Sequence, residues 1–167
     1  MSDSHLAAYL TDHLAGSVIA IDLLAQLEQN RNERQLTDAV ANLRAQIESD
    51  QRELQVLMHK LGIKQSVPRK AAGWLTAKIG EAKLRLEDSS QGALRLLESL
   101  EAVALGIDGK LALWRALQSI TEIAPTLEKI EYPRLISRAK EQRQVVEELR
   151  LSAARAALVP GLESARP

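Results

Sequence analysis

The chain has 167 residues with no cysteine, and its 22 Lys and Arg residues balance its 22 Asp and Glu residues. The missing cysteines exclude disulfides, thiol catalysis and zinc–thiolate sites and fit a reducing compartment, so we expect a cytoplasmic protein. Zero net charge provides no basic field for nucleic acid, and 46% hydrophobic residues with only 2% aromatics favour a core of aliphatic side chains between packed helices.

The N-terminal segment MSDSHLAAYL lacks the basic region and the apolar run of a signal peptide. No stretch stands out as the run of about 20 apolar residues that crosses a bilayer. Residues 4–29 instead carry apolar positions three and four apart, which predicts a first amphipathic helix. Two polar residues, His13 and Ser17, fall on its apolar stripe.

Asn30 followed by Glu33 resembles a capping box, so a second helix is expected from there to Leu61, with Gly62 ending it. Its apolar stripe includes one acid, Asp50. Because the connection between these two helices is short, we expect them to pack antiparallel.

Residues 68–86 begin at a proline and predict a short amphipathic helix with a basic fringe. Such a segment could contact an anionic membrane surface. Its apolar face is short, however, and the bundle needs that face as a cover, so membrane contact is not the preferred interpretation.

A third long helix is expected over about residues 91–120. Glu101 and Asp108 lie one residue off its apolar stripe, which includes Trp114. Gly106 and Gly109 lie in its middle, where each glycine costs about 1 kcal/mol relative to alanine. We interpret these glycines as places where a neighbouring backbone approaches closely.

A turn with two prolines leads to a last helix that starts near Pro133, carries Gln142 on its stripe and runs to about Leu158. We expect one domain, residues 1–159, and a flexible tail, residues 160–167. Two hairpins joined by a long crossover predict an all-α, ferritin-like four-helix bundle whose crossover carries a short extra helix. The alternative is a generic four-helix bundle with an inserted linker.

The chain resembles a group of small bacterial proteins of the ferritin-like superfamily that have no assigned activity. For the wider superfamily, the resemblance implies a four-helix bundle with a central carboxylate-bridged di-iron site where the ligands are present. The segments that carry the resemblance are HLAGSVIAIDLL (13–24), IESDQRELQVLMHKLG (47–62), AAGWLTAKIGEAKLRL (71–86) and ALGIDGKLALWRAL (104–117).

The di-iron ligand pattern is not met. It needs Glu-x-x-His on two helices, whereas the second helix offers Glu48 with Gln51 and the last offers Glu141 with Gln144. A glutamine oxygen is a poor replacement for imidazole. We therefore expect no metal, no cofactor and no catalytic residues. The alternative is a metal-binding or iron-handling oxidoreductase with an atypical carboxylate site.

Six polar residues near the apolar stripes are instead predicted to form a shielded cluster that fixes helix register. For Glu101 and Asp108, pairing with Lys or Arg at the edge of the stripe is the plainer alternative. The function that follows is a non-enzymatic structural or interaction module, possible as a homodimer through an exposed apolar stripe. The members of the predicted cluster are His13, Ser17, Asp50, Glu101, Asp108 and Gln142.

Overall fold

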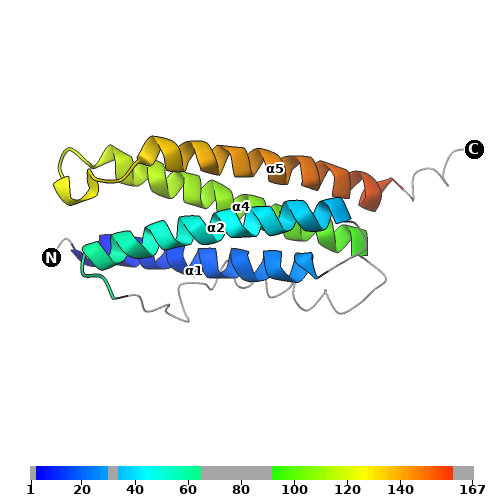
Figure 1. The fold of residues 1–167 in the computed structure, drawn as a ribbon, viewed down its shortest axis with the longest axis horizontal. Helices are drawn as coiled ribbons and strands as arrows, with labels where there is room; N and C mark the ends of the chain where they lie inside the picture. Colours follow the sequence, from blue (N-terminus) through cyan, green and yellow to red (C-terminus); the bar gives the residue numbers. More distant parts are fainter. Residues whose placement is uncertain (1–2, 30–33, 65–91, 160–167) are drawn as a thin grey trace, which may run out of the picture.

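The computed structural model describes residues 3–29, 34–64 and 92–159 (Figure 1). Four α-helices and one short 3₁₀ helix, with no strand, make up these described residues. This confirms the all-α, four-helix arrangement. The helix expected over 68–86 and the tail 160–167 lie outside the described residues. The elements are α1 (Asp3–Glu28), α2 (Arg34–Lys60), α4 (Gly92–Ser119), η2 (Pro125–Leu127) and α5 (Tyr132–Leu158).

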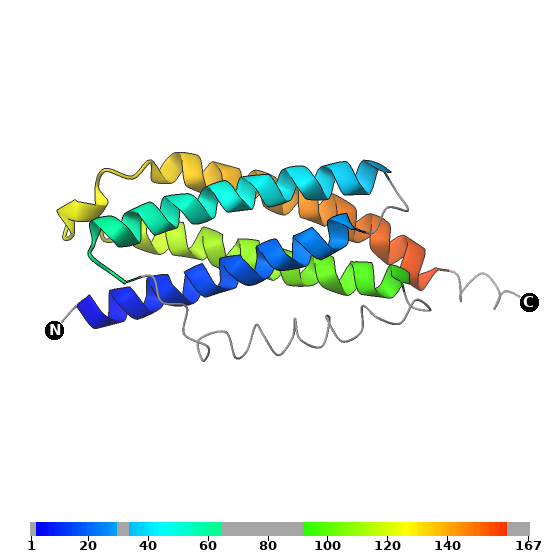
Figure 2. The same cartoon turned by 60° about the horizontal axis from the view of Figure 1, so that its bottom comes forward.

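The helices form two antiparallel hairpins, α1 with α2 and α4 with α5, which pack side by side (Figure 1). Helix α1 also contacts α4, and α2 also contacts α5, so neighbouring helices around the bundle run in opposite directions. As Figure 2 shows, α2 ends at one end of the bundle and α4 begins at the other. Helices α2 and α4 therefore run parallel at diagonal corners.

The C-terminus of α2 is closed by Gly62, as predicted. Gly62 has a φ of 68°, in the left-handed region that favours glycine. The amide of Ile63 donates to the Met58 carbonyl at 2.9 Å and that of Gly62 donates to the His59 carbonyl at 3.0 Å, which is the Schellman pattern. Ile63 then packs against the core and fixes the direction of the exit.

The α4–α5 connection contains a single 3₁₀ turn, η2, which begins at the first of the two prolines, Pro125. Tyr132 anchors it: the buried phenol donates to the Leu127 carbonyl at 3.0 Å, and burial raises the pKa of Tyr132 to about 12. Pro133 is the second residue of α5, one position later than the predicted first position. A proline is tolerated there because the first-turn amides have no partner within the helix.

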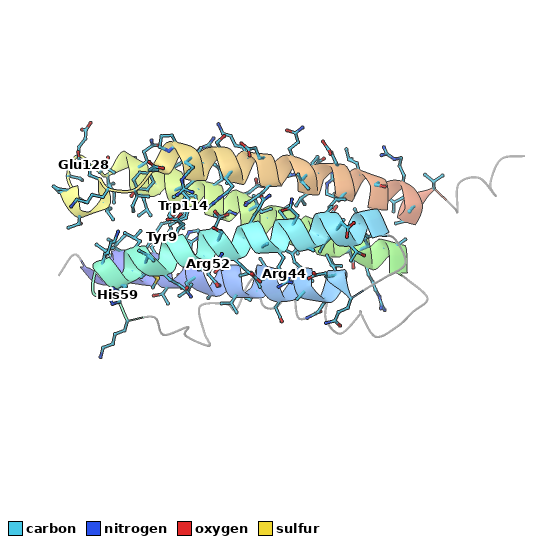
Figure 3. The ribbon with its side chains drawn as sticks, in the orientation of Figure 1. Tyr9, Arg44, Arg52, His59, Trp114 and Glu128 are labelled. Carbon is cyan, nitrogen blue, oxygen red and sulfur yellow. The ribbon has the colours of Figure 1, made fainter. Side chains whose placement is uncertain are left out.

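Two apolar clusters fill the bundle, one toward each end. The cluster nearer the α1–α2 connection is made only of aliphatic side chains, such as Leu24, Leu43 and Val146. The other contains Trp114 and Tyr132, and Figure 3 shows Trp114 in the half of the bundle that also holds His59. Between the two clusters, each long helix contributes polar side chains.

The predicted stripe of α2 is buried throughout. The stripe of α1 is rotated from the expected one, since Val18 is 45% exposed and His13 and Ser17 are only half-buried. One further expectation is corrected: among the described residues, the stretch His5–Glu28 is long and apolar enough, by length and composition alone, to cross a membrane. The core helix of a soluble protein and an N-terminal signal sequence both pass the same test, and 33% of the most apolar part of this stretch is buried within the bundle.

Candidate functional site

The layer between the two apolar clusters centres on the carboxylate of Asp50, which is 2% exposed. Its Oδ2 accepts hydrogen bonds from Lys110 of α4 and from the Gln142 amide of α5, the latter at 3.0 Å. Its Oδ1 forms an ion pair with Arg138, one turn before Gln142. We call Asp50, Lys110, Arg138 and Gln142 the central ion cluster. It joins α2, α4 and α5 at mid-length.

The central ion cluster holds one carboxylate against two cations. The Gln142 side chain matches both kinds of partner, because its Nε2 donates to Asp50 while its Oε1 accepts from Lys110. Burial lowers the pKa of Lys110; the Asp50 carboxylate opposes this shift, and Arg138 adds to it. The cluster thus carries an excess of one positive charge in a largely buried place.

Helix α1 meets this layer through Gln51, the neighbour of Asp50. The Gln51 amide donates to the Ser17 hydroxyl at 2.9 Å, and that hydroxyl donates to the Leu14 carbonyl at 2.7 Å. His13 lies one turn earlier, with its ring edge-on to Tyr9 at a centroid distance of 4.6 Å.

Burial is the main influence on the charge state of His13. It lowers the pKa of the imidazole, and the nearby Asp12 carboxylate only partly offsets it. The structure thus brings four of the six predicted residues to one level of the bundle, namely His13, Ser17, Asp50 and Gln142. Asp50 and Gln142 are in direct contact.

Glu101 and Asp108 do not belong to this group, which corrects the predicted cluster. Their side chains are 50% and 51% exposed and pair with Arg150 at 3.5 Å and Arg143 at 3.2 Å. Being one residue off the buried stripe turns them by about 100° toward the outer α4–α5 groove. Glu101 and Asp108 instead follow the alternative interpretation, in which they pair with Lys or Arg at the edge of the apolar stripe.

A row of exposed ion pairs runs along this groove. Glu147 accepts hydrogen bonds from Arg150 at 2.6 Å and from Arg143 at 2.9 Å, and these bonds lower the pKa of Glu147 to about 2. We call Glu101, Asp108, Arg143, Glu147 and Arg150 the surface ion-pair row.

Sequence reasoning missed the two cations of the central ion cluster, although both carry a signal. Lys110 lies three residues after Ile107 and four before Trp114, and both neighbours are buried. Arg138 lies four residues before Gln142 and has the same kind of place on α5. A cation at a stripe position requires an acid nearby.

Nothing in the described part of the chain assembles a metal-ligand set: it holds no group of three or more His, Asp or Glu side chains placed to bind an ion. Asp50 is the one buried acid among the described residues. Glu48 pairs instead with Arg44 at 2.8 Å, and Glu141 accepts a hydrogen bond from Ser137 at 3.0 Å.

The glycines of α4 mark a hollow, so their interpretation as close-packing sites is wrong. Among the described residues, a Cβ at Gly109 would have no neighbour within 4 Å, and one at Gly106 would meet only the Ala20 Cβ at an ordinary 3.9 Å. Both glycines line a cavity of about 280 Å³ between α1, α2 and α4. Asp50 and Lys110 also line it, so the cavity adjoins the central ion cluster.

No protein-family model, curated protein or solved structure matches this chain. The central ion cluster and the cavity are therefore the features from which its function has to be inferred.

Proposed function

We propose that this chain is a non-enzymatic helical-bundle protein of ferritin-like topology, acting as a structural or interaction module, in which the central ion cluster stands in place of a metal centre. The observation that carries the proposal is the pairing of Asp50. Each of its carboxylate oxygens faces a cation, Lys110 on one side and Arg138 on the other.

The charge of this layer argues against a bound metal cation. Iron, manganese and zinc require several deprotonated ligands around one position. Here the single buried carboxylate of the described residues is already compensated, and the net positive charge of the layer repels a further cation. The central ion cluster instead fixes the register of α2, α4 and α5 relative to one another.

The helix directions support the ferritin-like part of the proposal. In bundles of this type two antiparallel hairpins are joined by one long crossover. Helices α2 and α4 run parallel, and the end of α2 lies at the opposite end of the bundle from the start of α4 (Figure 1).

The partner proposed for such a module is a second copy of this chain. Leu151 and Leu158 lie two turns apart on one face of α5 and are 42% and 56% exposed. Light scattering across a concentration series tests this proposal. A dimer that Leu158→Glu dissociates supports it, and a monomer at every concentration contradicts it.

Metal analysis tests the main proposal. The full chain, purified without chelators, is expected to contain only substoichiometric iron, manganese and zinc, in the wild type and in Glu101→Ala alike. A stoichiometric metal ion that is lost in Asp50→Ala but retained in Glu101→Ala would overturn the proposal.

A further inference from the structure

The cavity beside the central ion cluster exists because small residues face it from two helices. Gly16 and Ala20 of α1 lie opposite Gly106 and Gly109 of α4, and the space that larger side chains would fill stays open. A glycine in the interior of a helix is less favourable than an alanine. The hollow is therefore kept at a cost in helix propensity.

The size and walls of the cavity suit a small molecule with an apolar body. Apolar atoms form most of the wall, among them those of Ile47, Leu54 and Leu113. An apolar cavity of about 150 Å³ holds benzene, and this one measures about 280 Å³. It has room for one ring with a short arm, or for an alkyl chain of similar volume.

Two side chains that line the cavity, Lys110 and Trp114, each have a donor without an acceptor among the described residues. An ammonium group has three N–H donors, and the described residues accept two from Lys110, through Asp50 and Gln142. The indole Nε1–H of Trp114, on a side chain that is 1% exposed, meets no acceptor among the described residues. Lys110 and Trp114 therefore each offer a donor that a bound acceptor could meet.

The charges of the central ion cluster also favour a bound acceptor. Asp50 faces two cations, so the layer next to the cavity is one negative charge short of neutrality. Burial lowers the pKa of Lys110 more than Asp50 raises it, and the second cation, Arg138, lowers it further. A bound anion would supply the missing charge. Asp12, which also lines the cavity, is exposed to solvent at its rim.

We propose that this cavity binds a small monocarboxylic acid with a compact apolar body, such as an aryl- or alkyl-carboxylate. The carboxylate accepts a hydrogen bond from Lys110, and the apolar body lies along the aliphatic wall next to Gly109. The proposal adds a ligand to the molecule and does not depend on the bundle's being a structural module.

Titration calorimetry of the full chain with three matched probes tests this proposal. The probes are 3-phenylpropanoate, 3-phenylpropan-1-ol and 3-phenylpropylamine, which share a body and differ in the charge of the head group. A charge-assisted hydrogen bond contributes about 1.5–3 kcal/mol, so the acid is expected to bind about tenfold or more tightly than the alcohol. The amine is expected not to bind.

Two variants locate the site. Gly109→Leu fills the hollow and should abolish binding of the acid, whereas Ala112→Leu adds the same side chain on the exposed face of α4 and should leave binding intact. Lys110→Met should reduce the affinity for the acid to that for the alcohol. Circular dichroism verifies that each variant is folded.

Three results would overturn the proposal: no heat of binding with the acid, equal affinity of the wild type for acid and alcohol, or unchanged binding in Gly109→Leu. If Lys110→Met does not fold, Gly109→Leu and its control decide the matter. If the chain contains no stoichiometric metal and also fails to bind the acid, the ligand proposal is wrong. The proposal that the chain is a structural or interaction module is then unaffected.

Discussion

The central ion cluster and the surface ion-pair row use the same chemistry in two environments. Both join acids to Arg or Lys on neighbouring helices, the cluster from α2 to α4 and α5 and the row from α4 to α5. Asp50 in the cluster is 2% exposed, whereas Glu101 and Asp108 in the row are 50% and 51% exposed. The comparison teaches that burial, rather than the number of ion pairs, decides how strongly each set constrains the fold.

The physical reason is that solvent screens exposed charges and does not reach buried ones. Water and salt screen an exposed pair, which contributes about 0–1 kcal/mol. A buried charge that loses its partner has neither water nor counter-charge, so breaking such a pair costs about 3–5 kcal/mol. The two sets should therefore respond very differently to the same substitution.

The largest effect is expected for Asp50→Ala. It leaves Lys110 and Arg138 without their acid, and the free energy of unfolding should fall by about 3–5 kcal/mol. Glu101→Ala, the matched change in the surface ion-pair row, should cost less than about 1 kcal/mol. Urea denaturation measures the free energy of unfolding of both variants. Equal losses in the two variants would contradict the expected difference between buried and exposed ion pairs.

Trp114→Ala separates the apolar contribution from the ionic one. Trp114 is 1% exposed in a core with few large side chains, so its truncation leaves a cavity and should cost about 3–5 kcal/mol. Thermal melting provides the measurement. A shift of only about 2 °C would show that this side chain is not part of the core.

The glycines of α4 are expected to respond in the opposite direction. In the part of the chain that the structure describes, Gly109→Ala meets no atom within 4 Å, and Gly106→Ala makes one ordinary contact at 3.9 Å. Each should raise the stability by about 0.4–1 kcal/mol, because alanine restricts the unfolded chain without straining the folded one. A lower melting temperature in both variants would restore close packing as the explanation.

The smallest effect concerns pH and His13. Burial lowers the pKa of His13 below its ordinary value of 6.5, so the unfolded chain binds the proton more readily. Stability should therefore decline as the pH falls through about 6.5 toward the folded-state pKa. His13→Gln should flatten this decline, measured as melting temperature against pH. The exposed His59→Gln serves as the control and should preserve it.

Much of the fold could be read from the sequence, because the three-four spacing of apolar residues determines which face of a helix is buried. That rule placed Asp50 and Gln142 on buried stripes, and the preference of helix C-termini for glycine predicted the Gly62 cap. It missed Lys110 and Arg138, because Leu111 and Ala139, each one residue further on, also fit the spacing and are apolar.

The role of the α4 glycines could not be predicted from the sequence. A glycine in the middle of a helix fits a tight crossing and a hollow equally well, because both require a missing side chain. Only the distance to the facing helix separates the two, and no described residue lies within 4 Å of a Cβ placed at Gly109. The rotation of Glu101 and Asp108 away from the core likewise depends on how α4 sits against α5.

The central claim, that Asp50 serves to neutralise buried cations, is tested most directly by a double-mutant cycle with Lys110→Met. The unfolding free energies of the wild type, Asp50→Ala, Lys110→Met and the double variant give the coupling between the two side chains. We predict that Lys110→Met destabilises the wild type but stabilises Asp50→Ala, with a coupling of about 1–3 kcal/mol. Losses that simply add in the double variant would contradict the claim.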